Sequence, residues 1–232
     1  RGNIGKTGAG ACPVRGHSNV QGNRTMGINE KPSMDFLDSL EKRYTFTVPR
    51  DHGFNTVESI HAMLEGKAKV FIALGGNFSA ATPDTKRTHQ ALKKCDLTVQ
   101  ISTKLNRSHV ITGKRALILP CLGRTEIDRQ TSGEQCITVE DSMSMVHASR
   151  GQNEPASSKL RSETSIVAGM AMASLGDKKV NWNKLASNYA LIREEISAVL
   201  PSFESYNSRI KQGRGFYLQN PAALRQWRTP EK

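Results

Sequence analysis

Several features that would assign a sequence quickly to a common class are missing from these 232 residues. No apolar run approaches the length of a membrane span, and no signal-peptide pattern opens the chain. The four cysteines include no Cys-x-x-Cys pair, so the sequence encodes neither a zinc knuckle nor an iron–sulfur motif. Isolated thiols beside apolar segments fit a reducing compartment, and we expect a cytoplasmic protein.

Aromatic residues are also scarce, at 6%, whereas 33 basic residues outnumber 21 acidic ones and give a net charge of +12. Such an excess attracts nucleic acid, acidic surfaces or a phosphorylated cofactor. The basic residues are scattered and are not interleaved with stacking aromatics, as they would be on a nucleic-acid-binding face. We therefore expect no nucleic-acid partner and no membrane span.

The chain is organised around an apolar strand that ends in a glycine turn. Lys69 to Leu74 is short, apolar and partly β-branched, which is typical of a buried parallel strand. The turn Gly75-Gly76-Asn77 lets the backbone approach a ligand, and Thr82-Pro83 is expected to cap the next helix. Anions bind in such a crevice at the end of an α/β sheet, although a tight turn without a ligand remains the alternative.

Further strands are expected at 97–101, 116–119 and 136–139, alternating with helices after Ser33, Thr56 and Pro83. This alternation predicts an α/β fold with a parallel, Rossmann-like sheet. The loops after Leu74 and Ile101 should then lie side by side. The second loop offers a polar cluster that includes Ser102, Thr103, Lys104 and Asn106.

The second half of the chain has helical periodicity over 160–175 and 182–199, with Gly176 and Pro201 as stops. We expect four consecutive segments. They are a glycine-rich segment (1–30), the α/β cofactor-binding domain (31–158), a helical C-terminal extension (159–212) and an irregular linker (213–232).

Residues 1–27 contain seven glycines and no helical or strand period. The alternative to a site here is a flexible terminal segment, and we expect residues 1–27 to be poorly anchored. Arg15, His17, Asn19 and Gln21 stand at alternate positions, so an extended backbone would direct them to one side. The chain opens at Arg1 in this motif, and we interpret it as a piece of a longer polypeptide.

The run from Gly2 to Gly22, with Met26-Gly27 after it, resembles molybdopterin-dependent oxidoreductases, in particular formate dehydrogenase alpha subunits and their relatives. The Gly-Gly-Asn turn, the polar loop after the next strand and a strand ending in Leu119-Pro120 recur there in the same order. The resemblance covers essentially the whole chain, and its first motif is long and specific.

The resemblance implies a molybdenum or tungsten ion held by two molybdopterin guanine dinucleotides, one of them cradled by the α/β domain. The implied cofactor-binding residues are Asn19, Gln21, Gly22, Gly75, Gly76, Asn77, Ser102, Thr103, Lys104 and Asn106. Arg15 matches an arginine beside the metal, and His17 stands where formate dehydrogenases more often have glutamine; both are implied catalytic residues. The aspartate common before the third strand is replaced around 113–115.

In this family the metal ligand and the iron–sulfur motif lie upstream, so the resemblance implies a fragment that is inactive alone. Its parent would carry out two-electron redox chemistry on a small substrate such as formate and pass electrons to a partner subunit. The alternative function is a nucleotide- or nucleic-acid-binding α/β module without redox chemistry, because fold alone does not separate the two.

Overall fold

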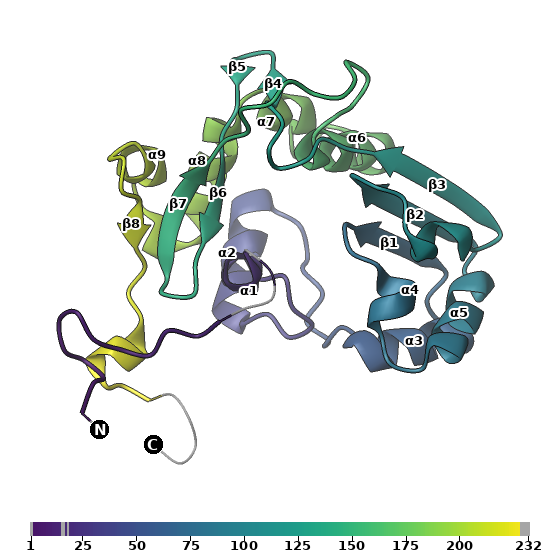
Figure 1. Ribbon diagram of the computed structural model, residues 1–232, viewed down its shortest axis with the longest axis horizontal. Coiled ribbons are helices and arrows are strands. Elements are labelled where there is room, and N and C mark those ends of the chain that lie inside the picture. The colour runs from purple at the N-terminus through teal and green to yellow at the C-terminus, as the bar shows by residue number, and fades with distance from the viewer. Residues whose placement is uncertain (1, 15–16, 18, 228–232) are drawn as a thin grey trace. The chain divides into compact units, whose positions relative to one another are not determined.

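The computed structural model describes residues 2–14, 17 and 19–227, and the chain forms two compact units (Figure 1). Residues 51–130 and 151–186 make up one, called here the parallel unit. Residues 1–50, 131–150 and 187–232 make up the other, called the antiparallel unit. Each unit is built from stretches that are separate along the chain.

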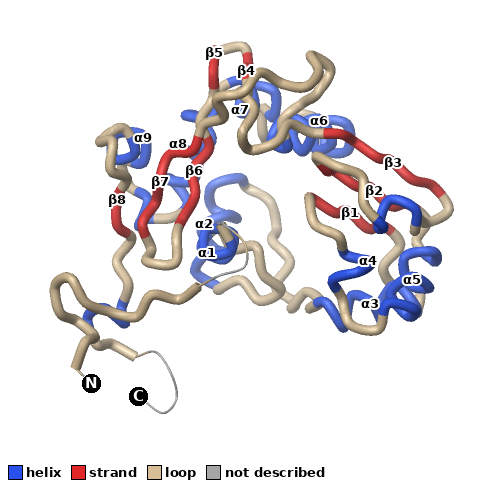
Figure 2. The backbone as a smooth tube through the Cα atoms, in the orientation of Figure 1, coloured by secondary structure: helices blue, strands red, loops and turns tan. Residues whose placement is uncertain are grey.

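The parallel unit contains a three-stranded sheet in the order β1 (Val70–Leu74), β2 (Leu97–Ser102) and β3 (Arg115–Pro120). All three strands run parallel, with Val70 opposite Leu97 and Leu97 opposite Arg115. Figure 2 shows these strands in red among the helices that connect them. The predicted α/β fold with a Rossmann-like parallel sheet is confirmed.

Helices pack on both faces of this sheet, but they do not cover it completely. On one face, α3 (Thr56–Leu64) and α5 (Thr85–Lys94) bury a cluster that includes Ile60, Met63 and Leu92. On the other, α6 (Glu163–Leu175) packs Ile166 and Met170 against strand residues such as Val99 and Ile101. Alternate strand residues point to opposite faces, so both layers are needed to bury the central strand β2. On the face where α6 lies, Val70, Ile72 and Leu74 of β1 stay 53–54% exposed, so β1 is not the buried strand that the sequence predicted.

Two helix starts differ from the sequence-based expectation. Asn55, not Thr56, caps α3, because its side chain and Glu58 form a reciprocal capping box. Asp84, not Thr82, caps α5 by accepting from the Arg87 N–H. Thr82 instead follows a separate short helix, α4 (Phe78–Ala81), and its hydroxyl donates to the Phe78 carbonyl.

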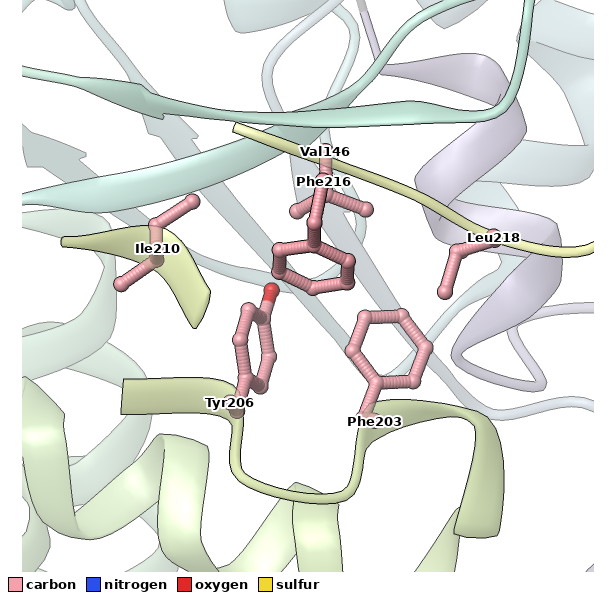
Figure 3. Close-up of a cluster of buried hydrophobic side chains, with 6 residues drawn as sticks. All are labelled: Val146, Phe203, Tyr206, Ile210, Phe216 and Leu218. Atoms are coloured by element: carbon pink, nitrogen blue, oxygen red, sulfur yellow. The ribbon is translucent and has the colours of Figure 1, made fainter. Parts of the chain in front are cut away.

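The antiparallel unit contains a second sheet, in the order β6 (Ile137–Glu140), β7 (Met145–Ser149) and β8 (Phe216–Tyr217). Its helices are α1 (Val20–Thr25), α2 (Met34–Tyr44), α8 (Tyr189–Val199) and α9 (Tyr206–Ile210). The core cluster is shown in Figure 3, with the Phe203, Tyr206 and Phe216 rings packed together. Val146, Ile210 and Leu218 complete the cluster.

This unit corrects four expectations. The strand expected at 136–139 as a fourth member of the parallel sheet is β6, which pairs with β7 through a tight hairpin at Asp141–Ser144. Residues after Gly213 are not wholly irregular, because β8 pairs with β7 and buries Phe216. The helix expected at 182–199 is divided into α7 (Trp182–Ser187) and α8 by Asn188, whose side chain caps α8.

The fourth correction concerns the N-terminal segment. An extended backbone was expected through Gln21, but α1 begins at Val20. Its Gly22 is buried, so this part of the segment is anchored, whereas 2–3 and 5–14 are exposed. Short elements complete the chain: β4 (Arg129–Gln130), β5 (Gly133–Glu134), η1 (Arg107–Val110), η2 (Pro201–Phe203) and η3 (Pro221–Leu224). No helix within the described ranges is long and apolar enough to cross a membrane.

Candidate functional site

The glycine turn after β1 is an open stretch of backbone. Gly75 and Gly76 have φ of 70° and 73°, the left-handed region that residues with a side chain seldom adopt. A Cβ built on either would meet no atom within 4 Å. The Gly75 N–H donates to the Ile101 carbonyl at 2.8 Å, which ties the turn to the end of β2. A ligand can therefore approach this backbone closely.

The loop after β2 lies directly beside the glycine turn. The Asn106 side chain donates from Nδ2 to the Gly76 carbonyl at 2.8 Å, and its Oδ1 accepts from the Ser108 N–H at 2.9 Å. Asn106 thus caps η1 while it holds the neighbouring turn in place. The prediction that the two loops lie side by side at one sheet edge is confirmed.

A buried polar network supports these loops from below. The Ser108 hydroxyl donates to Asn77 Oδ1 at 2.9 Å and accepts from the Ser79 N–H at 3.0 Å. Gln100 in β2 donates to the Ser108 carbonyl at 2.6 Å. The Asn77 oxygen is therefore used within the protein. The sequence-based site did not include Ser79 or Gln100, although a glutamine inside an apolar strand signals such a network.

The outer part of this edge carries exposed polar side chains. Thr103 and Lys104 are exposed, and the Ser102 hydroxyl donates to the Lys104 carbonyl at 2.8 Å. A lysine in the loop next to an open glycine turn suits an anionic group such as a phosphate. The helix directly after the turn, α4, has only four residues, so its dipole adds little to anion binding here.

His109 is a buried group at the same edge that sequence reasoning left out of the site. It is 6% exposed, and its Nδ1 accepts from the Asn106 N–H at 3.0 Å. Within the described residues its Nε2 has no hydrogen-bond partner.

The remaining sequence-predicted site residues belong to the antiparallel unit, except Arg15, which lies outside the described residues. His17 is exposed. Asn19, at a φ of 139°, accepts the Glu140 N–H on its Oδ1 at 2.9 Å. A Cβ on Gly22 would come within 2.1 Å of that oxygen, so only glycine allows this contact. Asn19 and Gly22 thus anchor α1 on β6, and the predicted roles of Asn19, Gln21 and Gly22 toward a cofactor stay predictions.

The cysteines do not gather into a metal site in the described part of the chain, where no group of three or more His, Cys, Asp or Glu residues is placed to hold a metal ion. Cys95 and Cys121 are buried and Cys12 is exposed. Burial raises the pKa of the Cys121 thiol to about 11. These two buried thiols are core residues, whereas Cys136 is only partly buried.

The sheet and its open glycine edge define a Rossmann-like α/β protein. The chain is similar over 230 residues to the protein YdeP of Escherichia coli, at 53% identity, and over 231 residues to an "uncharacterized oxidoreductase" of Mycobacterium tuberculosis, at 52%. Each match covers 99% of this chain, and the chain spans 30% of the length of either relative.

A more distant similarity, 29% over 115 residues, links the chain to a "putative formate dehydrogenase" of Bacillus subtilis and covers 46% of this chain and 12% of that protein. No family model matches the chain. Of these relatives, the one from Mycobacterium tuberculosis is named an oxidoreductase and the one from Bacillus subtilis a putative formate dehydrogenase.

Proposed function

We propose that this chain is the cofactor-binding portion of an oxidoreductase and that its parallel unit holds a phosphate-bearing part of a molybdopterin guanine dinucleotide. The observation that carries the proposal is the open Gly75-Gly76 turn, fastened to Asn106 of the neighbouring loop, which also carries the exposed Lys104. The oxidoreductase names of the relatives and the resemblance of residues 2–22 to molybdopterin enzymes support the redox class.

The residues at this edge fit part of such a cofactor. The bare backbone of Gly75 and Gly76 leaves room for a phosphate, and Lys104 supplies a positive charge. Ser102, Thr103 and Asn106 supply further polar groups. When bound, the cofactor supplies a metal that exchanges two electrons with a small substrate such as formate. The chain's own share of the chemistry is to position the cofactor and tune its surroundings.

The proposal extends to residues and partners beyond this edge. Arg15 would hold the substrate carboxylate through its planar pair of donors, with His17 beside it. Asn19, Gln21 and Gly22 would contact the cofactor. The metal ligand, an iron–sulfur cluster and contacts to an electron-transfer subunit would belong to other parts of a longer cytoplasmic protein.

Calorimetric titration of the chain with GDP tests the proposal, because GDP carries the guanine and phosphates of the cofactor. We expect weak binding, about micromolar to millimolar, since only part of the cofactor's contacts are available. Added salt should weaken it, because exposed charges are screened over about 10 Å at 0.1 M. Lys104→Ala should weaken binding several-fold. The control Lys178→Ala, which removes another exposed lysine of the same unit, should not.

A parallel titration with a single-stranded oligonucleotide distinguishes the cofactor-binding function from the alternative, a nucleic-acid-binding module. A nucleic-acid module would bind the oligonucleotide better than GDP, with small contributions from many basic residues and a steep salt dependence. Tight oligonucleotide binding without heat or a thermal shift from GDP would refute the cofactor proposal for this chain.

A further inference from the structure

The strand β1 is packed on only one of its two faces. On that face Phe71 lies against the cluster that α3 and α5 bury, and its ring centroid is 4.8 Å from that of Phe78. On the α6 face, Val70, Ile72 and Leu74 are each exposed by 53–54%. Their partners in register on β2 belong to the cluster that α6 covers, namely Leu97, Val99 and Ile101. The apolar surface of this sheet face thus continues from β2 onto β1 but is not covered there.

The same strand also has a free edge. The strand order β1-β2-β3 leaves no described strand on the outer side of β1 (Figure 1). On the inner side, the Lys69 carbonyl and the Gly75 N–H form hydrogen bonds with the backbone of the β2 segment. Backbone groups point alternately to the two sides along a parallel strand, so those of Val70, Ile72 and Leu74 point outward.

The sequence of β1 is that of an inner strand. Natural edge strands are usually protected by a charged residue, a proline or a bulge. Val70–Leu74 contains neither a charge nor a proline, and its register with β2 runs through five consecutive pairs without a bulge. A short apolar run of this kind is typical of strands that have a neighbour on each side and are buried on both faces.

We propose that a further strand and helix of a longer polypeptide complete this sheet, the strand pairing with the outer edge of β1 and the helix packing on Val70, Ile72 and Leu74. A parallel strand would satisfy the outward backbone groups, and the helices that connect parallel strands cover the faces of the sheet. The length of a relative supports an occupant from the same polypeptide, since this chain spans 30% of YdeP of Escherichia coli. The inference stands whether or not the glycine turn binds a cofactor.

A second copy of the chain suits this surface less well. Stable association of separate molecules buries roughly 20–30 residues on each side. The uncovered face of β1 offers three apolar side chains, and the net charge of +12 makes two copies repel each other. A segment of the same polypeptide needs no such area, because the covalent connection gives it a high effective concentration.

Labelling of a cysteine on this face tests the proposal. Ile72→Cys is made in this chain and in a fusion, which is YdeP with its matched segment replaced by this chain. Reaction with N-ethylmaleimide is followed at this cysteine by peptide mass spectrometry. It should be fast in the chain alone and at least about tenfold slower in the fusion, because burial protects the thiol. The control Lys86→Cys, at an exposed position of α5, should react equally fast in both.

Thermal unfolding gives a second measurement. Ile72→Lys should leave the unfolding midpoint of the chain alone nearly unchanged, because the side chain is half exposed there, and should lower the midpoint of the fusion by several degrees. Ile72→Val keeps the position apolar and should affect the fusion much less. If the fusion fails to fold, the same substitutions at the aligned positions of full-length YdeP give the decision.

Equal labelling rates of Ile72→Cys in the chain and in the fusion would overturn the proposal. So would slow labelling in the chain alone, or equal slowing of Lys86→Cys in the fusion. Protection in the chain alone that increases with its concentration would overturn it as well, because the occupant would then be a second copy.

Discussion

At the scale of single residues, glycines and asparagines set the local geometry of the glycine turn after β1 and of helix α1. Gly76 has a left-handed φ that leaves its carbonyl within 2.8 Å of the Asn106 amide. Gly22 makes room for the Asn19 oxygen that receives the Glu140 N–H. Two small residues thus allow two side-chain amides to fasten the turn and α1.

Gly76→Ala should destabilise the chain through its backbone alone, because open space surrounds the position. We expect the free energy of unfolding to fall by about 1 to 2 kcal/mol, the cost of a left-handed backbone for alanine. Gly169→Ala, at an exposed interior position of α6, is the matched control and should raise it by about 0.5 to 1 kcal/mol. Denaturant unfolding measures both, and equal effects of the two substitutions would contradict this explanation.

At the scale of elements, side chains rather than propensity decide where helices begin and what they contact. Asn55, Asp84 and Asn188 each cap a helix through a side-chain oxygen. Between α2 and α8, Arg43 donates to both oxygens of Glu195 at 2.8 and 2.6 Å, and the Tyr44 hydroxyl donates at 3.0 Å. A bidentate pair of this kind fixes the two helices more specifically than a single contact does.

The ion pair between Arg43 and Glu195 should make the free energy of unfolding depend on pH. The hydrogen bond from Arg43 holds the pKa of Glu195 below its usual value of 4.5. The stabilisation is therefore present above that value and lost as pH falls through the lower pKa of the folded state. Unfolding midpoints measured from about pH 6 to about pH 3, a range that brackets ordinary carboxyl groups, should show this loss.

Glu195→Gln should be less stable than the unmodified chain at pH near 6, and the difference should shrink toward the acid end. Glu194→Gln, the exposed neighbour, serves as the control and should follow the unmodified chain. A constant difference for Glu195→Gln at every pH would show that the ion pair does not contribute in this way.

At the scale of the whole molecule, each unit has its own core. The parallel unit buries its central strand β2 between two helical layers, and the antiparallel unit buries an aromatic cluster against a small sheet. All four cysteines are free thiols, and two of them lie in the core of the parallel unit. Their reactivity therefore reports the integrity of that core.

Reaction with a disulfide reagent such as DTNB should distinguish these thiols. In the native chain Cys12 should react at once, whereas Cys95 and Cys121 should react only on unfolding, because burial raises the pKa of both. Cys12→Ser should remove the fast reaction and leave the slow ones unchanged. Rapid native-state reaction of all four thiols would show that the core of the parallel unit is open.

The sequence by itself determined the features that depend on local order. The alternation of apolar strands and amphipathic helices predicted the parallel sheet, and the double glycine predicted its turn. Gly176 marked the end of α6, where it adopts a positive φ. Adjacency of the two loops followed as well, since neighbouring parallel strands end at one edge of a sheet.

Only the tertiary structure decided the features that depend on pairing between distant segments. A short apolar run such as 137–140 suits a parallel or an antiparallel partner, and the hairpin to β7 chose the latter. Phe216 gave no periodic signal because its strand has two residues, yet it is buried by Phe203 and Tyr206. The Glu140 N–H at the end of β6 donates to Asn19, 121 positions earlier in the chain. No local pattern records such a contact, because the free energy that stabilises it comes from burial and arises only once the chain has folded.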